Sequence, residues 1–242
     1  MTQTQNNTDL TLILPVYNEE ECIRKTLEEA HGVLAKLSLL FEILAVDDGS
    51  SDRTPALLKE LAAQLPGLRV FRLTPNSGQS AAMGVGFRHA RGRVIVLMDA
   101  DGQNDPAEIP RLLEGLKSHD VCCGYRANRQ DSASKRIGSR LANRIRNWAL
   151  GEDVIDTGCT LKAFKAEWVQ DLPMWRGMHR FLPALVRMKG ATLGQIPVNH
   201  RPRQAGRSKY TNWGRLRETI WDLWAVRWMQ KRNRRFKSEE VA

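Results

Sequence analysis

The chain has 242 residues, of which 42% are hydrophobic and 26% charged, a composition that predicts one α/β domain or at most two small ones. It contains no run of about 20 apolar residues and no signal-peptide pattern, so we expect neither a membrane-spanning helix nor export. The four cysteines lack C-x-x-C spacing, which favours reduced, buried thiols over a disulfide framework: Cys22, Cys122, Cys123 and Cys159.

The positive charge is concentrated near the C-terminus. Residues 201–237 contain twelve Lys and Arg residues against Glu218 and Asp222, which equals the net charge of +10 of the whole chain. This distribution predicts an anionic partner, and phosphates, nucleic acid and an acidic membrane are the three classes to consider.

The first half alternates between apolar strand patterns and amphipathic helix patterns. Strands are predicted at residues 10–16, 41–46, 68–73, 93–98 and 120–124. Helices are expected after the first four strands, with Asn18, Asp52 and Asp105 as caps and Pro106 in a first turn. Alternation with short loops predicts an α/β fold with a right-handed, mostly parallel, doubly wound sheet flanked by helices.

Polar residues follow three of these strands, at what becomes one edge of a parallel sheet: Tyr17–Glu19, Asp47–Ser50 and Asp99–Asp101. Side chains alternate along a strand, so Asp99 and Asp101 are expected to point the same way. Two adjacent carboxylates are tolerated where a divalent cation lies between them and a phosphate. For this motif alone, the alternative that Asp99 caps a turn and Asp101 starts a helix stays open.

Four segments, taken in order, carry a family resemblance: Pro15–Glu19, Val46–Ser50 with Asp52 and Thr54, Asn76–Gln79, and Asp99–Gln103. Together they resemble the signatures of family 2 glycosyltransferases with a GT-A (Rossmann-like) fold. Within that family the sequence is most similar to dolichyl-phosphate mannose synthases and bacterial polyprenyl-phosphate glycosyltransferases. The resemblance covers about residues 10–210.

The resemblance implies a nucleotide-sugar site and a metal site. The nucleotide-sugar residues would be Pro15, Tyr17, Asn18, Glu19, Asp47, Asp48, Gly78, Gln79 and Asp99. The ligands of a Mg²⁺ or Mn²⁺ ion on the diphosphate would be Asp99, Asp101 and Gln103.

Basic motifs in the second half resemble the acceptor side of the same family. They lie at Gly124–Arg126, Lys135–Arg140 and Arg203–Lys209. The implied acceptor-phosphate residues are Arg126, Lys135, Arg136, Ser139, Arg203, Ser208 and Lys209. We take Asp99, Asp101, Arg126, Arg203 and Lys209 as the catalytic set. The chain departs from the family pattern at Asp156–Lys162, so the sugar stays open.

The resemblance predicts an inverting, metal-dependent transferase that moves a sugar from a UDP- or GDP-sugar to a polyprenyl phosphate. Two alternatives stay open: a family 2 transferase with a hydroxyl acceptor in cell-envelope glycan synthesis, and a non-catalytic nucleotide-sugar or lipid-binding adaptor. The five histidines have no metal-site spacing, so surface or packing roles are expected for them.

Residues 213–229 read as a helix whose tryptophans and apolar residues recur every three or four positions, followed by a basic cluster up to Lys237. The predicted stripe consists of Trp213, Leu216, Ile220, Leu223, Trp224 and Trp228, widened by Trp221, Ala225 and Met229. Such a helix suits the headgroup region of a membrane, and the alternative is a helix packed on the protein's own core.

We therefore divide the chain into a catalytic domain (1–210) and a basic amphipathic tail (211–242). We expect a cytoplasmic protein attached peripherally to the inner face of the cytoplasmic membrane, with a small membrane-spanning protein as an additional partner. Nucleic acid is not expected as a partner, because no nucleic-acid-binding module is recognisable.

Overall fold

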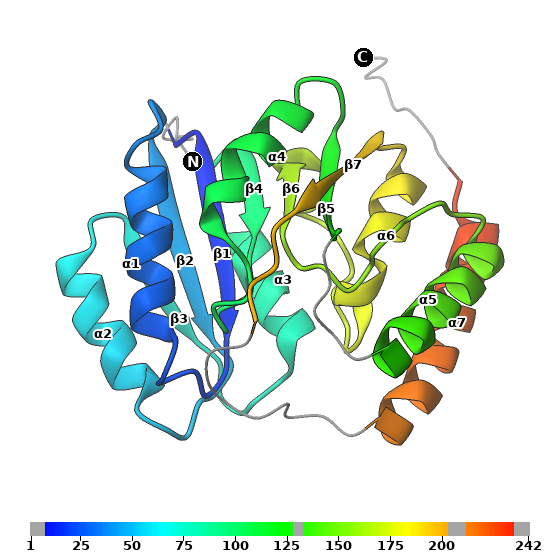
Figure 1. The fold of residues 1–242 in the computed structure, drawn as a ribbon, viewed down its shortest axis with the longest axis horizontal. Coiled ribbons are helices and arrows are strands. Elements are labelled where there is room, and N and C mark those ends of the chain that lie inside the picture. The colour runs from blue at the N-terminus through cyan, green and yellow to red at the C-terminus, as the bar shows by residue number, and fades with distance from the viewer. Residues whose placement is uncertain (1–7, 128–132, 203–211, 235–242) are drawn as a thin grey trace, which may run out of the picture.

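The computed structural model describes residues 8–127, 133–202 and 212–234, with the backbone alone for 133–137, 140 and 212–218. Its centre is a seven-stranded sheet with the order β3-β2-β1-β4-β6-β5-β7 (Figure 1). The strands are β1 (Leu10–Val16), β2 (Phe41–Asp47), β3 (Leu68–Arg72), β4 (Val94–Leu97), β5 (Val121–Arg126), β6 (Lys162–Lys165) and β7 (Leu193–Val198). The helices are α1 (Ile23–Leu34), α2 (Thr54–Gln64), α3 (Gln79–His89), α4 (Ile109–Gly115), α5 (Ala133–Leu150), α6 (Leu182–Lys189) and α7 (Asn212–Arg232). The described residues also form the 3-10 turns η1 (Pro106–Glu108), η2 (Ala166–Trp168) and η3 (Met178–Phe181).

The five strands predicted from the sequence are β1 to β5, so the prediction of a mostly parallel α/β sheet is confirmed. β1 pairs in parallel with both β2 and β4, and β3 continues the parallel run beyond β2. β6 is the exception, since it pairs antiparallel with β4 on one side and with β5 on the other. β7 then pairs in parallel with β5.

Helices cover both faces of the sheet, because the central strands are apolar on both sides. Leu12 and Leu14 of β1 pack into one buried cluster with side chains from α1, α2 and α4. Ile13, between them, packs into a second cluster with side chains from α3 and α6. This two-faced burial is what a doubly wound sheet requires.

The predicted helix caps had different outcomes. Asn18 is not the cap of α1, because the helix begins at Ile23 and Cys22 occupies the cap position. Asn18 has a positive φ of 51°, and its side-chain oxygen accepts a hydrogen bond from the Ser51 amide instead. Asp105 does cap the turn that contains Pro106, since its carboxylate accepts from the Ala107 amide.

Helix α7 was predicted correctly as a helix, but its apolar residues lie on two faces. Figure 1 shows it beside α5. Val226, absent from the predicted stripe, is fully buried in a third cluster, with Leu223 and Met229 packed against that cluster. Trp224 and Trp228 are exposed on the other side of the helix. One face of α7 is therefore packed on the protein's own core, as the alternative expected, and the binding of the exposed face to a membrane stays a prediction. Within the part of the chain that the structure describes, no helix is long and apolar enough to cross a bilayer.

Candidate functional site

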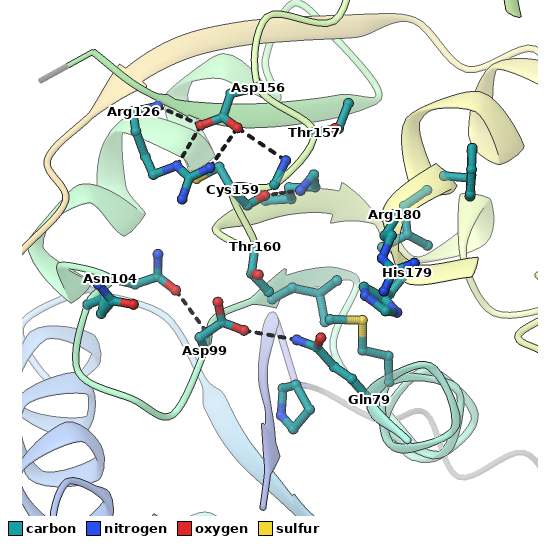
Figure 2. Close-up of a pocket in the computed structure, with 18 of the residues that line it drawn as sticks. Gln79, Asp99, Asn104, Arg126, Asp156, Thr157, Cys159, Thr160, His179 and Arg180 are labelled. Carbon is teal, nitrogen blue, oxygen red and sulfur yellow. Dashed lines mark hydrogen bonds and ion pairs between the residues drawn. The ribbon is translucent and has the colours of Figure 1, made fainter. Parts of the chain in front are cut away.

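One cleft of about 1210 Å³ lies at the carboxyl ends of β1, β2 and β4. Its lining comes from both halves of the sequence (Figure 2). The first half contributes the loops after β1, β2 and β4, and the second half contributes α5, the segment before β6 and the η3 turn. The polar strand ends predicted from the sequence therefore do meet at one edge of the sheet.

Asp99 lies two residues beyond the end of β4 and is held by two neighbours. Its carboxylate accepts a hydrogen bond from Gln79 Nε2 (3.0 Å), while its amide donates to Asn104 Oδ1 (2.9 Å). Burial and the nearby charge of Asp101 raise the pKa of Asp99 to about 6. This carboxylate is therefore oriented by the protein and lies within electrostatic reach of Asp101.

Asp101 also lines the cleft, and its carboxylate accepts from the Gln103 amide (3.1 Å). The backbone bends after Asp99, so the pair does not sit on an extended strand as the alternation argument assumed. Among the described residues, no group of three or more His, Cys, Asp or Glu side chains forms a metal cage. Two carboxylates still fit Mg²⁺ chemistry, because proteins commonly hold that ion with one or two carboxylates plus substrate phosphates.

Asp48 organises the loop before α3. Its carboxylate accepts from the amides of Ser77 (2.8 Å) and Gly78 (2.8 Å) and from Asn76 Nδ2 (2.9 Å). Gly78 has a φ of 90°, which favours glycine and turns its amide toward this carboxylate. Burial raises the pKa of Asp48, and the hydrogen bonds from the loop oppose that effect.

Asp47 and Asn18 were expected at the nucleotide sugar, but neither is among the described residues that line the cleft. Asp47 is buried, accepts from the Ser50 amide (3.0 Å) and forms an ion pair with Arg72 (3.3 Å). Asn18 binds the neighbouring loop through its amide, which donates to Ser50 Oγ (2.8 Å). Both residues thus hold the β1 and β2 loops together instead of facing the cleft.

Arg126 was expected to grip a phosphate, and in the structure it forms a two-pronged ion pair with Asp156. Its Nε lies 2.6 Å from Asp156 Oδ2 and its Nη2 lies 2.8 Å from Oδ1. The same carboxylate also accepts from the Gly158 amide (3.1 Å). Arg126 lines the cleft, so Asp156 fixes the plane of a guanidinium that faces the ligand space.

The remaining predicted residues fall into two groups. Those that line the cleft are Pro15, Tyr17, Glu19, Gly78, Gln79, Gln103 and Ser139. Those that lie outside the described residues are Arg203, Ser208 and Lys209, and only the backbone of α5 is described at Lys135 and Arg136.

The structure adds cleft residues that the sequence reasoning did not assign: Thr160, Lys162, His179, Arg180 and His200. Two of these are histidines, His179 and His200, for which surface or packing roles were expected, and the structure places both at the cleft. Lys162 is buried, and its ammonium donates to the Cys159 carbonyl. The sequence held one signal for Lys162, the departure from the family pattern at Asp156–Lys162, but that departure did not indicate that the lysine lines the cleft.

The segment after β7 is joined to the Asp101 loop. The Arg201 amide donates to the Gln103 carbonyl (2.8 Å), and the Arg201 guanidinium pairs with Glu29 (2.5 Å) and Asp105 (2.9 Å). The basic G-x-S-K segment predicted for the acceptor phosphate begins two residues later. The described chain is therefore held at Arg201 beside the loop that carries the carboxylate pair.

Residues 11–172 match the family model described as glycosyl transferase family 2. This chain belongs to glycosyl transferase family 2. The family predicted from the four N-terminal motifs is therefore confirmed.

Curated relatives of this family 2 chain are named undecaprenyl-phosphate 4-deoxy-4-formamido-L-arabinose transferase. The protein from Edwardsiella ictaluri is 37% identical over 204 residues, which is 83% of this chain and 62% of that protein. The one from Pseudomonas aeruginosa is 38% identical over 217 residues, or 88% of this chain and 63% of that protein. The chain thus spans a little under two thirds of the length of these relatives.

Solved structures confirm the GT-A fold. Glucosyl-3-phosphoglycerate synthase from Mycobacterium tuberculosis, in complex with Mg²⁺ and UDP, superposes with a TM-score of 0.66 at 18% identity over 93% of this chain and 80% of that one. S. aureus TarS 1–349 with UDP-GlcNAc gives 0.64 at 18% identity over 95% and 68%. At this identity the likeness concerns the fold alone.

Proposed function

We propose that this chain transfers a sugar from a nucleotide sugar to a polyprenyl phosphate, with inversion at the anomeric carbon. The observation that carries the proposal is one cleft in which the Asp48 loop and the Asp99–Asp101 pair face the basic second half. The names of the curated relatives support undecaprenyl phosphate as the acceptor lipid.

The donor side is assigned to the loops after β1, β2 and β4. Tyr17 and Glu19 line this side of the cleft, and Asp48 holds the Gly78 loop against it. We assign these groups to the nucleoside, because the carboxylate pair farther along the cleft suits the diphosphate.

We assign Asp99 and Asp101, with Gln103 beside them, to hold Mg²⁺ or Mn²⁺. When bound, the ion would neutralise the negative charge that develops on the leaving diphosphate. The chain contributes orientation, since Gln79 holds the Asp99 carboxylate before any ligand arrives.

The acceptor side is assigned to Arg126 and Ser139 in the cleft and to Arg203, Ser208 and Lys209 of the basic segment. A lipid phosphate is already an anion near neutral pH, so its oxygen can attack without a general base, whereas a hydroxyl acceptor needs one. Asp156, which lies in this half, accepts hydrogen bonds from Arg126 and is poorly placed to be that base. Cations in this half would align the acceptor phosphate and offset its repulsion by the donor diphosphate.

We also propose peripheral attachment to the inner face of the cytoplasmic membrane through what we call the α5–α7 apolar face. This face consists of the exposed side chains Leu141, Ile145, Trp148, Ile220, Trp221, Trp224 and Trp228. Exposed basic residues lie on the same helices and just beyond α7: Arg144, Arg227, Lys231, Arg232 and Arg234. Tryptophan suits the headgroup region, and each basic residue near an anionic surface contributes about 1 kcal/mol before screening.

The apolar face continues into the cleft, because Ile145 and Ile220 belong to both. A lipid whose head enters the cleft would therefore keep its chain along apolar side chains. A small membrane-spanning protein remains an additional partner in this proposal.

The test is a screen of UDP- and GDP-sugars with undecaprenyl phosphate and Mg²⁺ or Mn²⁺. The expected product is a lipid-linked sugar that mild acid releases, because a glycosyl phosphate is more acid-labile than an ordinary glycoside. A screen with membrane extract in place of undecaprenyl phosphate supplies hydroxyl acceptors as well, and an acid-stable product there would favour a hydroxyl acceptor. Binding of nucleotide sugar without any transfer would favour an adaptor.

A further inference from the structure

The η3 turn presents two side chains to the cleft from a fixed base. Met178 and Phe181 are fully buried in the third hydrophobic cluster, while His179 and Arg180, between them, line the cleft. The turn begins after Gly177, whose φ is 90° and whose position would place a Cβ 2.3 Å from Asp222 Oδ2. Only glycine fits there, so the backbone of this turn is strongly specified.

The His179 ring is oriented by Ser80, which is 2% exposed. Ser80 Oγ lies 2.8 Å from His179 Nδ1 and accepts from the His179 amide at 3.2 Å. The contact between Ser80 Oγ and Nδ1 fixes the orientation of the ring and of its other nitrogen, Nε2. Nε2 donates when the hydroxyl donates to Nδ1 and accepts when Nδ1 donates to the hydroxyl, and in both tautomers it can hydrogen-bond a sugar hydroxyl.

Ser80 also links His179 to the carboxylate pair. Gln79 precedes it at the start of α3 and donates to Asp99. Figure 2 shows His179 on the same side of the cleft as Gln79, with Arg126 and Asp156 on the other side. In a nucleotide sugar the sugar is bonded directly to the terminal phosphate. His179 contacts Ser80, the neighbour of the Gln79 that holds Asp99. His179 is therefore placed to meet that sugar.

We propose that His179 is a specificity-determining residue that hydrogen-bonds a hydroxyl of the donor sugar, and that Ser80 is its positioning residue. The inference rests on the proposed function, since it assumes that the diphosphate lies at Asp99 and Asp101. His179 lies beyond residues 11–172, the part matched by the family model.

The experiment measures sugar recognition separately from nucleotide recognition. Calorimetric titrations with Mn²⁺ use UDP, UDP-glucose, UDP-galactose, UDP-N-acetylglucosamine, UDP-glucuronic acid, GDP and GDP-mannose. The proteins are the wild type, His179→Ala, His179→Gln, Ser80→Ala and the control His89→Ala. His89 is a solvent-exposed histidine stacked on Phe71 outside the cleft.

For the nucleotide sugar that the wild type binds best, His179→Ala should lose about 5- to 10-fold in affinity, the usual effect of one neutral hydrogen bond. Affinity for the matching nucleoside diphosphate should change less than 2-fold. Ser80→Ala should show a smaller loss of affinity for the nucleotide sugar. His179→Gln should recover part of the affinity that His179→Ala loses, because its side-chain amide restores a hydrogen-bonding group. His89→Ala should match the wild type.

Equal losses for nucleotide sugar and nucleoside diphosphate, or no loss in His179→Ala, would overturn the inference and leave the proposed function intact. A wild type that binds none of the seven nucleotides would instead refute the proposed function, and this inference with it. Thermal unfolding of each variant separates a folding defect from a binding defect.

Discussion

The ion pair between Arg126 and Asp156 makes the clearest quantitative prediction. The side chains of Arg126 and Asp156 are only 14% and 9% exposed, and their two contacts are 2.6 and 2.8 Å long. Asp156→Ala leaves the Arg126 guanidinium partly buried without its partner, and also removes the acceptor of the Gly158 amide. Breaking a buried pair in this way costs about 3–5 kcal/mol of unfolding free energy.

For a chain of this length, 1 kcal/mol shifts the melting temperature by about 2–4 °C, so Asp156→Ala should melt about 6–20 °C below the wild type. Urea unfolding monitored by circular dichroism gives the free energy itself. The control is Arg93→Ala, which breaks the ion pair of Arg93 with Asp9, where the arginine side chain is 81% exposed. That exposed pair is screened by solvent, so its loss should leave the melting temperature nearly unchanged.

The double variant Arg126→Met/Asp156→Leu separates stability from function. Apolar replacement of both partners should recover most of the lost stability, because no uncompensated charge stays buried. The transfer rate of the double variant should nevertheless stay low, because the oriented guanidinium is gone. If the unfolding free energy of Asp156→Ala lies within 1 kcal/mol of the wild-type value, the ion pair does not stabilise the fold as argued. Full transfer activity in the stable double variant would remove Arg126 from the acceptor site.

Three further predictions concern other parts of the chain. Asp101→Asn should abolish transfer without lowering the melting temperature, and near-normal turnover in this variant or in EDTA would refute the metal assignment. The hydrogen bond from Lys165 is the main reason why the pKa of Asp120 falls from 3.8 to about 2. Its stabilising effect, about 1 kcal/mol after solvent screening, is therefore complete above pH 4 and lost as the pH falls toward 2. The stability gap between wild type and Asp120→Asn in urea should close over that range, and a constant gap would contradict the assignment. Replacing Trp224 and Trp228 by serine should reduce co-sedimentation with anionic liposomes at low salt, and unchanged sedimentation would refute the apolar-face proposal.

The first half of the fold was predictable because its strands are continuous apolar runs bounded by polar loops. The second half gave weaker signals. Strand β6 (Lys162–Lys165) has only four residues and a lysine at each end, so no periodic pattern marks it. Its antiparallel direction depends on pairing with β4 and β5, which are distant in sequence. Helix α5 leaves several apolar side chains exposed, which also blurs the pattern of a core helix.

The candidate site was predictable where a motif follows a strand directly. Asp99, Asp101 and Asp48 belong to such motifs, and the structure places all three at the cleft. Asp47 was misjudged because it ends β2 with a buried side chain held by the Ser50 amide and Arg72, whereas Asp48 lies in the loop that follows the strand. His179 was missed because its position depends on Ser80, 99 residues earlier in the sequence. No local pattern encodes such a contact.

Strand β6 brings cations of the second half of the chain close to the Asp99 carboxylate of the first half. It lies between β4, which leads to Asp99, and β5, which ends in Arg126. The charges of Lys162, at the start of β6, and of Arg126, at the end of β5, both act to lower the pKa of Asp99 against the effects of burial and of Asp101. The cations of the second half thus stabilise the carboxylate proposed to hold the metal. A substitution on either side of β6 should therefore alter the other side, and donor and acceptor variants are best interpreted in pairs.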